Sequence, residues 1–103
     1  MKTPRNFVLE IYNENKNDLF SQGLFLGYFE AKLNLLEFRF KNVMFKTKSL
    51  RNDLWIINNV RTECFDDMKI LSNLEPFDNN VATIKTTVLK EYENLYIKTK
   101  LNQ

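Results

Sequence analysis

The chain has 103 residues, a formal net charge of +2, no histidine and one cysteine, Cys64. Without histidine, the usual acid, base and metal ligand near neutral pH is missing, and neither a Ser–His nor a Cys–His nucleophile pair can be assembled. Without a second cysteine, no structural zinc site of the usual kinds forms within one chain. We therefore expect a protein that is not an enzyme and uses no cofactor and no metal.

Length and apolar content set the expected architecture. With 103 residues, 44% of them hydrophobic, the chain is expected to fold as a single domain, residues 1–103, around one core. No apolar run is long enough to span a bilayer and no signal-peptide core is visible, which predicts a cytoplasmic protein with no membrane partner. Cys64 is expected to be a buried small hydrophobic residue. Abundant lysine and asparagine are typical of an AT-rich genome, such as that of a phage, plasmid or other mobile element.

The first half of the chain mixes two kinds of periodicity. Residues 7–12 alternate weakly, which predicts a short strand, and the polar residues 13–18 predict a break. Apolar residues from 19 to 33 recur at helical spacing, which predicts a helix, with a strand pair as the alternative. From 36 to 48, apolar residues alternate with charged ones, which predicts two strands joined by a turn or kink at Asn42.

The second half begins with the clearest helix signal. Ser49 is a suitable N-cap, and a helical period predicts a helix from about Leu50 to Phe65, with a continuation or a restart through Met68, Ile70 and Leu71 as the two options. Pro76 and the polar residues around it predict a loop at 75–80.

Residues 81–101 fit either a helix or a β-hairpin, and their threonines and tyrosines favour the hairpin. The predicted fold class is therefore α+β, with helices packed on one face of a small antiparallel sheet and a winged-helix-like variant as an option.

Charge is divided along the chain. Residues 32–51 contain six cations and one acid, whereas residues 53–78 contain six acids and two cations. In the predicted strand pair, cations share the solvent face, where they would contact phosphates, and the following helix extends that face. The candidate nucleic-acid-binding residues are Arg39, Lys41, Lys46, Lys48 and Arg51. The alternative is that they are solvated edge-strand charges that guard against aggregation.

The acidic half suggests a different surface. Trp55, Glu63, Asp66 and Asp67 would form an acidic and aromatic patch that docks on a basic partner protein. The three carboxylates could also hold a hard cation, but the EF-hand spacing is absent, so a solvated face near a helix end is the simpler interpretation.

Two functions follow from these surfaces. The first is a nucleic-acid-binding accessory or regulatory protein, in which a hairpin at 81–101 with Tyr92 and Tyr96 would act as a wing. The second is a protein-directed inhibitor or adaptor, for example an anti-defence factor that docks on a host nucleic-acid machine. A homodimer is a further expectation, because an exposed apolar stripe between Leu19 and Leu33 would need covering.

Overall fold

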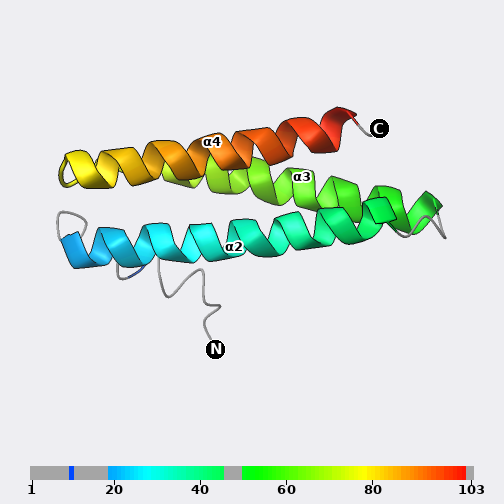
Figure 1. Cartoon of the computed structure of the whole chain (residues 1–103), viewed down its shortest axis with the longest axis horizontal. Coiled ribbons are helices and arrows are strands. Elements are labelled where there is room, and N and C mark those ends of the chain that lie inside the picture. Colours follow the sequence, from blue (N-terminus) through cyan, green and yellow to red (C-terminus); the bar gives the residue numbers. More distant parts are fainter. Residues whose placement is uncertain (1–9, 11–18, 46–49, 102–103) are drawn as a thin grey trace.

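The computed structural model describes residues 10, 19–45 and 50–101, and its long elements are three helices packed as a bundle (Figure 1). Helix α2 spans Leu19–Phe45, α3 spans Leu50–Ser72 and α4 spans Asn79–Leu101. Consecutive helices run in opposite directions, so α2 and α4 are parallel to each other and antiparallel to α3. No described residue lies in a strand. The predicted α+β fold, its sheet and its winged-helix variant are therefore wrong.

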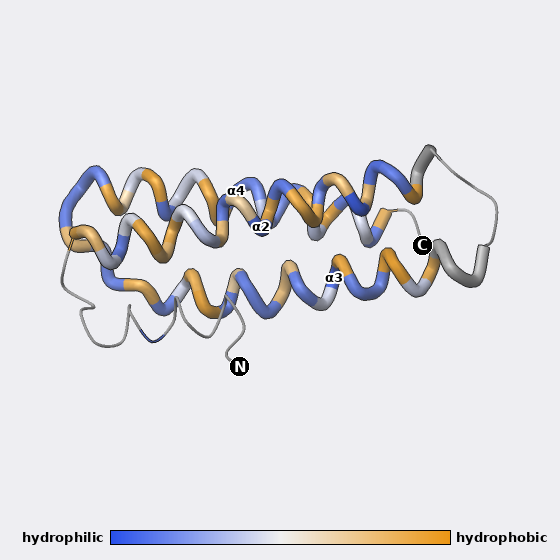
Figure 2. The backbone as a smooth tube through the Cα atoms, turned by 90° about the horizontal axis from the view of Figure 1, so that it is seen from below, coloured by the Kyte–Doolittle hydropathy of each residue, from blue (hydrophilic) through white to orange (hydrophobic). Residues whose placement is uncertain are grey.

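The helices bury residues at alternating spacings of three and four positions, with one step of seven positions in α4, from Val81 to Val88. The buried seam of α2 is Gln22, Leu26, Phe29, Leu33, Leu36, Phe40 and Val43. That of α3 and the turn after it is Ile57, Val60, Cys64, Asp67, Leu71 and Leu74. That of α4 is Val81, Val88, Tyr92, Leu95 and Thr99. This heptad spacing keeps one side of each helix against its neighbours, and apolar residues recur along all three helices in Figure 2.

The strand pair predicted at 36–48 is wrong because two periodicities overlap in this stretch. Leu36, Phe38 and Phe40 alternate as they would in a strand. Leu36, Phe40 and Val43 are also spaced to continue the seam of α2, and in the helix they are buried. Phe38, which the strand would have buried together with Leu36 and Phe40, is 63% exposed in the helix. Asn42 lies within the helix and not at a turn.

The hairpin favoured at 81–101 is also wrong, since these residues belong to α4. Thr83, Thr86 and Thr87 fit a helix because each hydroxyl donates a hydrogen bond of 2.9–3.0 Å to the carbonyl four residues earlier. Asp78 is the N-cap of the helix, because its Oδ1 accepts a hydrogen bond of 2.9 Å from the Val81 N–H.

The helices predicted from residue 19 and from residue 50 are confirmed, and α3 continues to Ser72. The predicted loop is confirmed as far as Asp78, and α4 begins at Asn79. Gln22 holds this loop against the start of α2: its Nε2 donates to the Glu75 carbonyl at 2.8 Å, and its Oε1 accepts from the Phe77 N–H at 2.6 Å.

Three other predictions fall outside the described residues. They are the strand at 7–12, the break at 13–18 and the N-cap Ser49. Within the first of these, only Glu10 is described, and it is helical.

Candidate functional site

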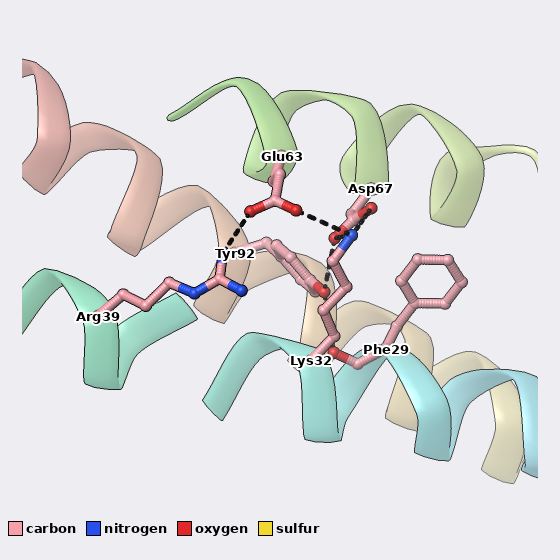
Figure 3. A network of polar contacts seen from close by, with 6 residues as sticks. All are labelled: Phe29, Lys32, Arg39, Glu63, Asp67 and Tyr92. Atoms are coloured by element: carbon pink, nitrogen blue, oxygen red, sulfur yellow. Dashed lines mark hydrogen bonds and ion pairs between the residues drawn. The ribbon is translucent and has the colours of Figure 1, made fainter. Parts of the chain in front are cut away.

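A polar network inside the bundle takes one side chain from each helix (Figure 3). Lys32 Nζ of α2 lies 3.1 Å from each carboxylate oxygen of Asp67 of α3. The Tyr92 hydroxyl of α4 lies 3.1 Å from Asp67 Oδ2 and 2.9 Å from the carbonyl oxygen of Phe29. Asp67 is 0% exposed, so these contacts replace the water that its carboxylate loses on folding.

The interior of the bundle raises the pKa of two neighbouring groups. Burial is the main cause of the raised pKa of Tyr92, and the charge of Asp67 and its hydrogen bond with the hydroxyl add to the effect. Burial also raises the pKa of Cys64 to about 12, assisted by the charges of Asp67 and Glu63. The expectation that Cys64 is a buried small residue is confirmed. Its neutral thiol is the form that the fold favours.

The two oppositely charged stretches of the sequence meet across the α2–α3 interface. Arg39 Nη1 donates to Glu63 Oε2 at 2.9 Å, and Lys32 Nζ lies 3.9 Å from Glu63 Oε1 (Figure 3). Lys32 and Arg39 are seven positions apart, which places them on the flank of α2 that faces α3. Part of the basic stretch therefore pairs with part of the acidic stretch inside the molecule.

The structure does not gather the five predicted nucleic-acid-binding residues on one described face. Arg39 faces Glu63, whereas Lys41 is exposed and lies about 200° further around the helix. Lys46 and Lys48 lie outside the described residues, and Arg51 belongs to the first turn of α3. The strand face expected to align them does not form, because α2 remains helical to its end.

The four predicted partner-binding residues have different environments. Trp55 is 68% exposed, Asp66 is exposed and Glu63 is half-buried in its ion pair. Asp67 is a core residue, so the expected solvated acidic face does not include it. Within 10, 19–45 and 50–101, no group of three or more acidic or cysteine side chains is placed to hold a metal ion.

A groove lies between α2 and α3, towards the end of the bundle at which α2 ends and α3 begins. It has a volume of about 720 Å³. It is lined by Arg39, Asn42, Val43, Trp55, Ile56, Asn59 and Glu63. The order of residues along the two helices places the Arg39–Glu63 ion pair at the inner part of the groove and Trp55 at the outer part.

The groove joins residues from both predicted surfaces: Arg39 from the basic set, and Trp55 and Glu63 from the acidic set. Asn42, Ile56 and Asn59 were not among the predicted site residues. Each of them lies next to a buried seam position of α2 or α3 in the sequence. They can be recognised in this way only when the heptad register of both helices is known.

Comparison with protein-family models, curated proteins and solved structures found no match. Of the helices in the described part of the chain, none combines the length and the apolar content needed to cross a membrane. The groove and its lining are therefore the features on which a functional proposal rests.

Proposed function

We propose that this protein is a non-enzymatic adaptor or inhibitor that binds a partner protein through the α2–α3 groove. The observation that carries the proposal is Trp55, which is 68% exposed beside a groove of about 720 Å³. Large aromatic side chains, tryptophan among them, are the usual anchors of protein interfaces. Buried Val43 and partly buried Ile56 give the groove apolar lining, and the Arg39–Glu63 ion pair gives its inner part polar lining.

The lining fits one face of an amphipathic helix of the partner. Such a helix would lie along the groove, with apolar side chains against Trp55 and Ile56. The side-chain amides of Asn42 and Asn59 would pair with polar groups at its edges. Binding would then add a helix to the two that form the groove, using the packing that already holds the bundle together.

Trp55 is the only tryptophan in the chain, so its fluorescence reports on the groove directly. Helical peptides would be selected from a displayed library on the wild-type protein, with counter-selection on Asn59→Arg, which places a long side chain in the groove. We expect the selected peptides to shift the Trp55 emission to shorter wavelengths. We expect the variant Trp55→Ala, measured by calorimetry, to bind them at least tenfold more weakly.

The matched control is Phe77→Ala, which removes an exposed aromatic side chain from the α3–α4 loop at the other end of the bundle. This variant should bind the peptides as tightly as the wild type. If no peptide is enriched on the wild type over Asn59→Arg, or if Trp55→Ala binds equally well, the proposal is wrong.

The second candidate function is nucleic-acid binding by a basic end of the bundle. Lys41, near the end of α2, Arg51, at the start of α3, and Lys98 and Lys100, in the last turn of α4, belong to helix ends that lie at the same end of the molecule (Figure 1). This convergence supports contact with phosphates without the strand pair.

A titration of fluorescent DNA and RNA at two salt concentrations tests the second candidate. We expect binding that weakens steeply with salt and is lost in the double variant Lys41→Glu/Lys98→Glu. The control, Lys69→Glu/Lys90→Glu, changes the net charge equally at other positions and should retain binding. Absence of binding at low salt would exclude nucleic acid as the partner, and equal binding by both double variants would exclude this end of the bundle as the site.

A further inference from the structure

Two aromatic side chains lie next to each other where α3 and α4 meet at the surface. The ring of Phe65 of α3 and the ring of Tyr96 of α4 have centroids 6.3 Å apart. Phe65 is 48% exposed, whereas Tyr96 is partly buried and packs against the core. A hollow of about 320 Å³ adjoins this aromatic pair and is lined by Phe65, Met68, Lys69, Ser72 and Asn73. The pair and the hollow offer apolar surface to a side chain of another molecule.

A lysine lies over each ring of the aromatic pair. Lys69 Nζ is 5.3 Å from the centroid of Phe65, and Lys100 Nζ is 4.8 Å from the centroid of Tyr96. Each lysine follows its aromatic residue by four positions, which places it about one turn further along its own helix. Because α3 and α4 are antiparallel, that turn points in opposite directions on the two helices (Figure 1). The aromatic pair is therefore flanked by a cation at each of its two ends.

The positive charge of this surface is not neutralised by neighbouring carboxylates. Lys85 of α4 adds a third cation, because its Nζ donates to a backbone carbonyl of the turn after α3 at 2.7 Å. Two acids are close along the helices, Asp66 and Glu93. In the described part of the chain, however, neither Lys69 nor Lys100 forms an ion pair with these acids or with any other carboxylate. An anionic partner is therefore the charge complement of this surface.

Two classes of macromolecule carry such negative charge, and the aromatic pair favours an acidic protein segment over single-stranded nucleic acid. Bases bind aromatic residues by stacking on an open ring face. Here an ammonium group already lies over each ring, so a base would have to displace it. A carboxylate has no such requirement, because it pairs with the ammonium group where that group already lies.

We propose that the α3–α4 surface, formed by Phe65, Lys69, Tyr96 and Lys100, docks an acidic segment of a partner protein. An apolar side chain of the segment packs in the hollow beside Phe65, and carboxylates before and after it pair with Lys69 and Lys100. The surface shares no residue with the α2–α3 groove, which α3 lines from its other flank. The protein then has a docking site on each flank of α3. The second site goes beyond the function proposed above, and either site can fail alone.

Peptide selection on a variant without the groove anchor tests the α3–α4 surface separately. A displayed peptide library would be selected on Trp55→Ala, with counter-selection on Lys69→Gln/Lys100→Gln, which retains the groove. We expect the enriched peptides to carry an apolar residue between acidic ones. No enrichment, or enriched peptides that lack acidic residues, would overturn the proposal.

Calorimetry with the selected peptides then compares variants of the wild-type chain. We expect Lys69→Gln/Lys100→Gln to bind at least tenfold more weakly, and Phe65→Ala, which removes a ring and no charge, at least fivefold more weakly. The matched control is Lys41→Gln/Lys90→Gln, which removes two exposed lysines elsewhere on the bundle and should bind as tightly as the wild type. Circular dichroism checks that all variants are folded. Equal losses in both double variants, or unchanged binding by Phe65→Ala, would contradict the proposed contacts.

A fluorescent oligothymidylate tests the other class of anionic partner. We expect it to bind Lys69→Gln/Lys100→Gln no more weakly than it binds the wild type. Affinity for the wild type that is lost in this double variant would show that the α3–α4 surface binds nucleic acid, and the proposal would then be wrong.

Discussion

The middle of the bundle and its groove end place polar and apolar residues in opposite ways. In the middle, Lys32, Asp67 and Tyr92 bring charged and hydroxyl groups into the core, where they bind one another. At the groove end, Trp55 is exposed and the Arg39–Glu63 ion pair lies at the surface. The two regions differ in role: the buried polar groups in the middle specify how the helices align, and the exposed Trp55 at the groove end is available for binding.

One buried polar residue lies on the seam of each helix: Gln22 in α2, Asp67 in α3 and Thr99 in α4. If α3 slid by one heptad, Asp67 would no longer meet Lys32 and Tyr92, and its buried carboxylate would lose these two partners. Buried polar residues in helix bundles set register in this way, at some expense of stability.

The largest expected effect comes from removing the cation of the central network. Lys32→Met leaves the buried carboxylate of Asp67 without its cation, and we expect a loss of about 3–5 kcal/mol in the free energy of unfolding. The double variant Lys32→Met/Asp67→Leu should recover most of this loss, because an apolar pair of similar volume is often as stable as a buried ion pair. Urea denaturation measures both. A loss below 1 kcal/mol in the single variant would show that the network does not hold the middle of the bundle.

Alkaline pH is expected to have the next largest effect, again through the middle of the bundle. The pKa of Cys64 is raised from 9.0 to about 12 by folding, and that of Tyr92 is raised from 10.0. A raised folded-state pKa means that the stabilisation is complete below the unfolded value and is lost as the pH rises above it. Stability should therefore be constant around pH 8 and fall from about pH 9 upward, by about 1.4 kcal/mol per pH unit for each group that titrates.

Denaturation of Cys64→Ala across the same pH range provides the control. This variant lacks the thiol, so its stability should begin to fall nearer to pH 10, where Tyr92 alone contributes. Identical pH profiles for the variant and the wild type would show that the thiol does not contribute.

A smaller effect, of opposite sign, is expected on the solvent side of α2. Gly23→Ala should raise the free energy of unfolding by about 1 kcal/mol, because alanine is the better helix former and the added methyl group meets nothing within 4 Å. Thermal denaturation at low protein concentration measures this on the monomer. A destabilised variant would show that something covers this position.

Part of the fold was predictable because some segments carry only one periodicity. The spacing of the apolar residues from Ile57 to Cys64 fits a helix and does not fit a strand, and α3 was predicted correctly. In α2, Phe38 between Leu36 and Phe40 gives an alternation typical of a strand. Whether these residues form a strand or a helix depends on whether the buried seam of the preceding helical turns continues through them. Only packing against α3 and α4 decides that question.

The buried polar residues explain the remaining errors. Asp67 occupies a core position of α3, yet its carboxylate indicates a surface position when Lys32 and Tyr92 are not known to be its partners. The charge division was a real pattern, but its physical meaning, ion pairs between α2 and α3, required the antiparallel register of the two helices. Trp55, by contrast, was predicted to belong to a partner-binding surface, and it is 68% exposed.

One paired measurement tests most directly whether the groove end binds while the middle of the bundle folds. Affinity for a peptide selected on the wild type and stability in urea would be measured on the same samples of wild type and Trp55→Ala. We expect Trp55→Ala to lose at least tenfold in affinity while its free energy of unfolding changes by less than about 0.5 kcal/mol. Unchanged affinity, or a loss of affinity accompanied by a loss of several kcal/mol in stability, would contradict that division of roles.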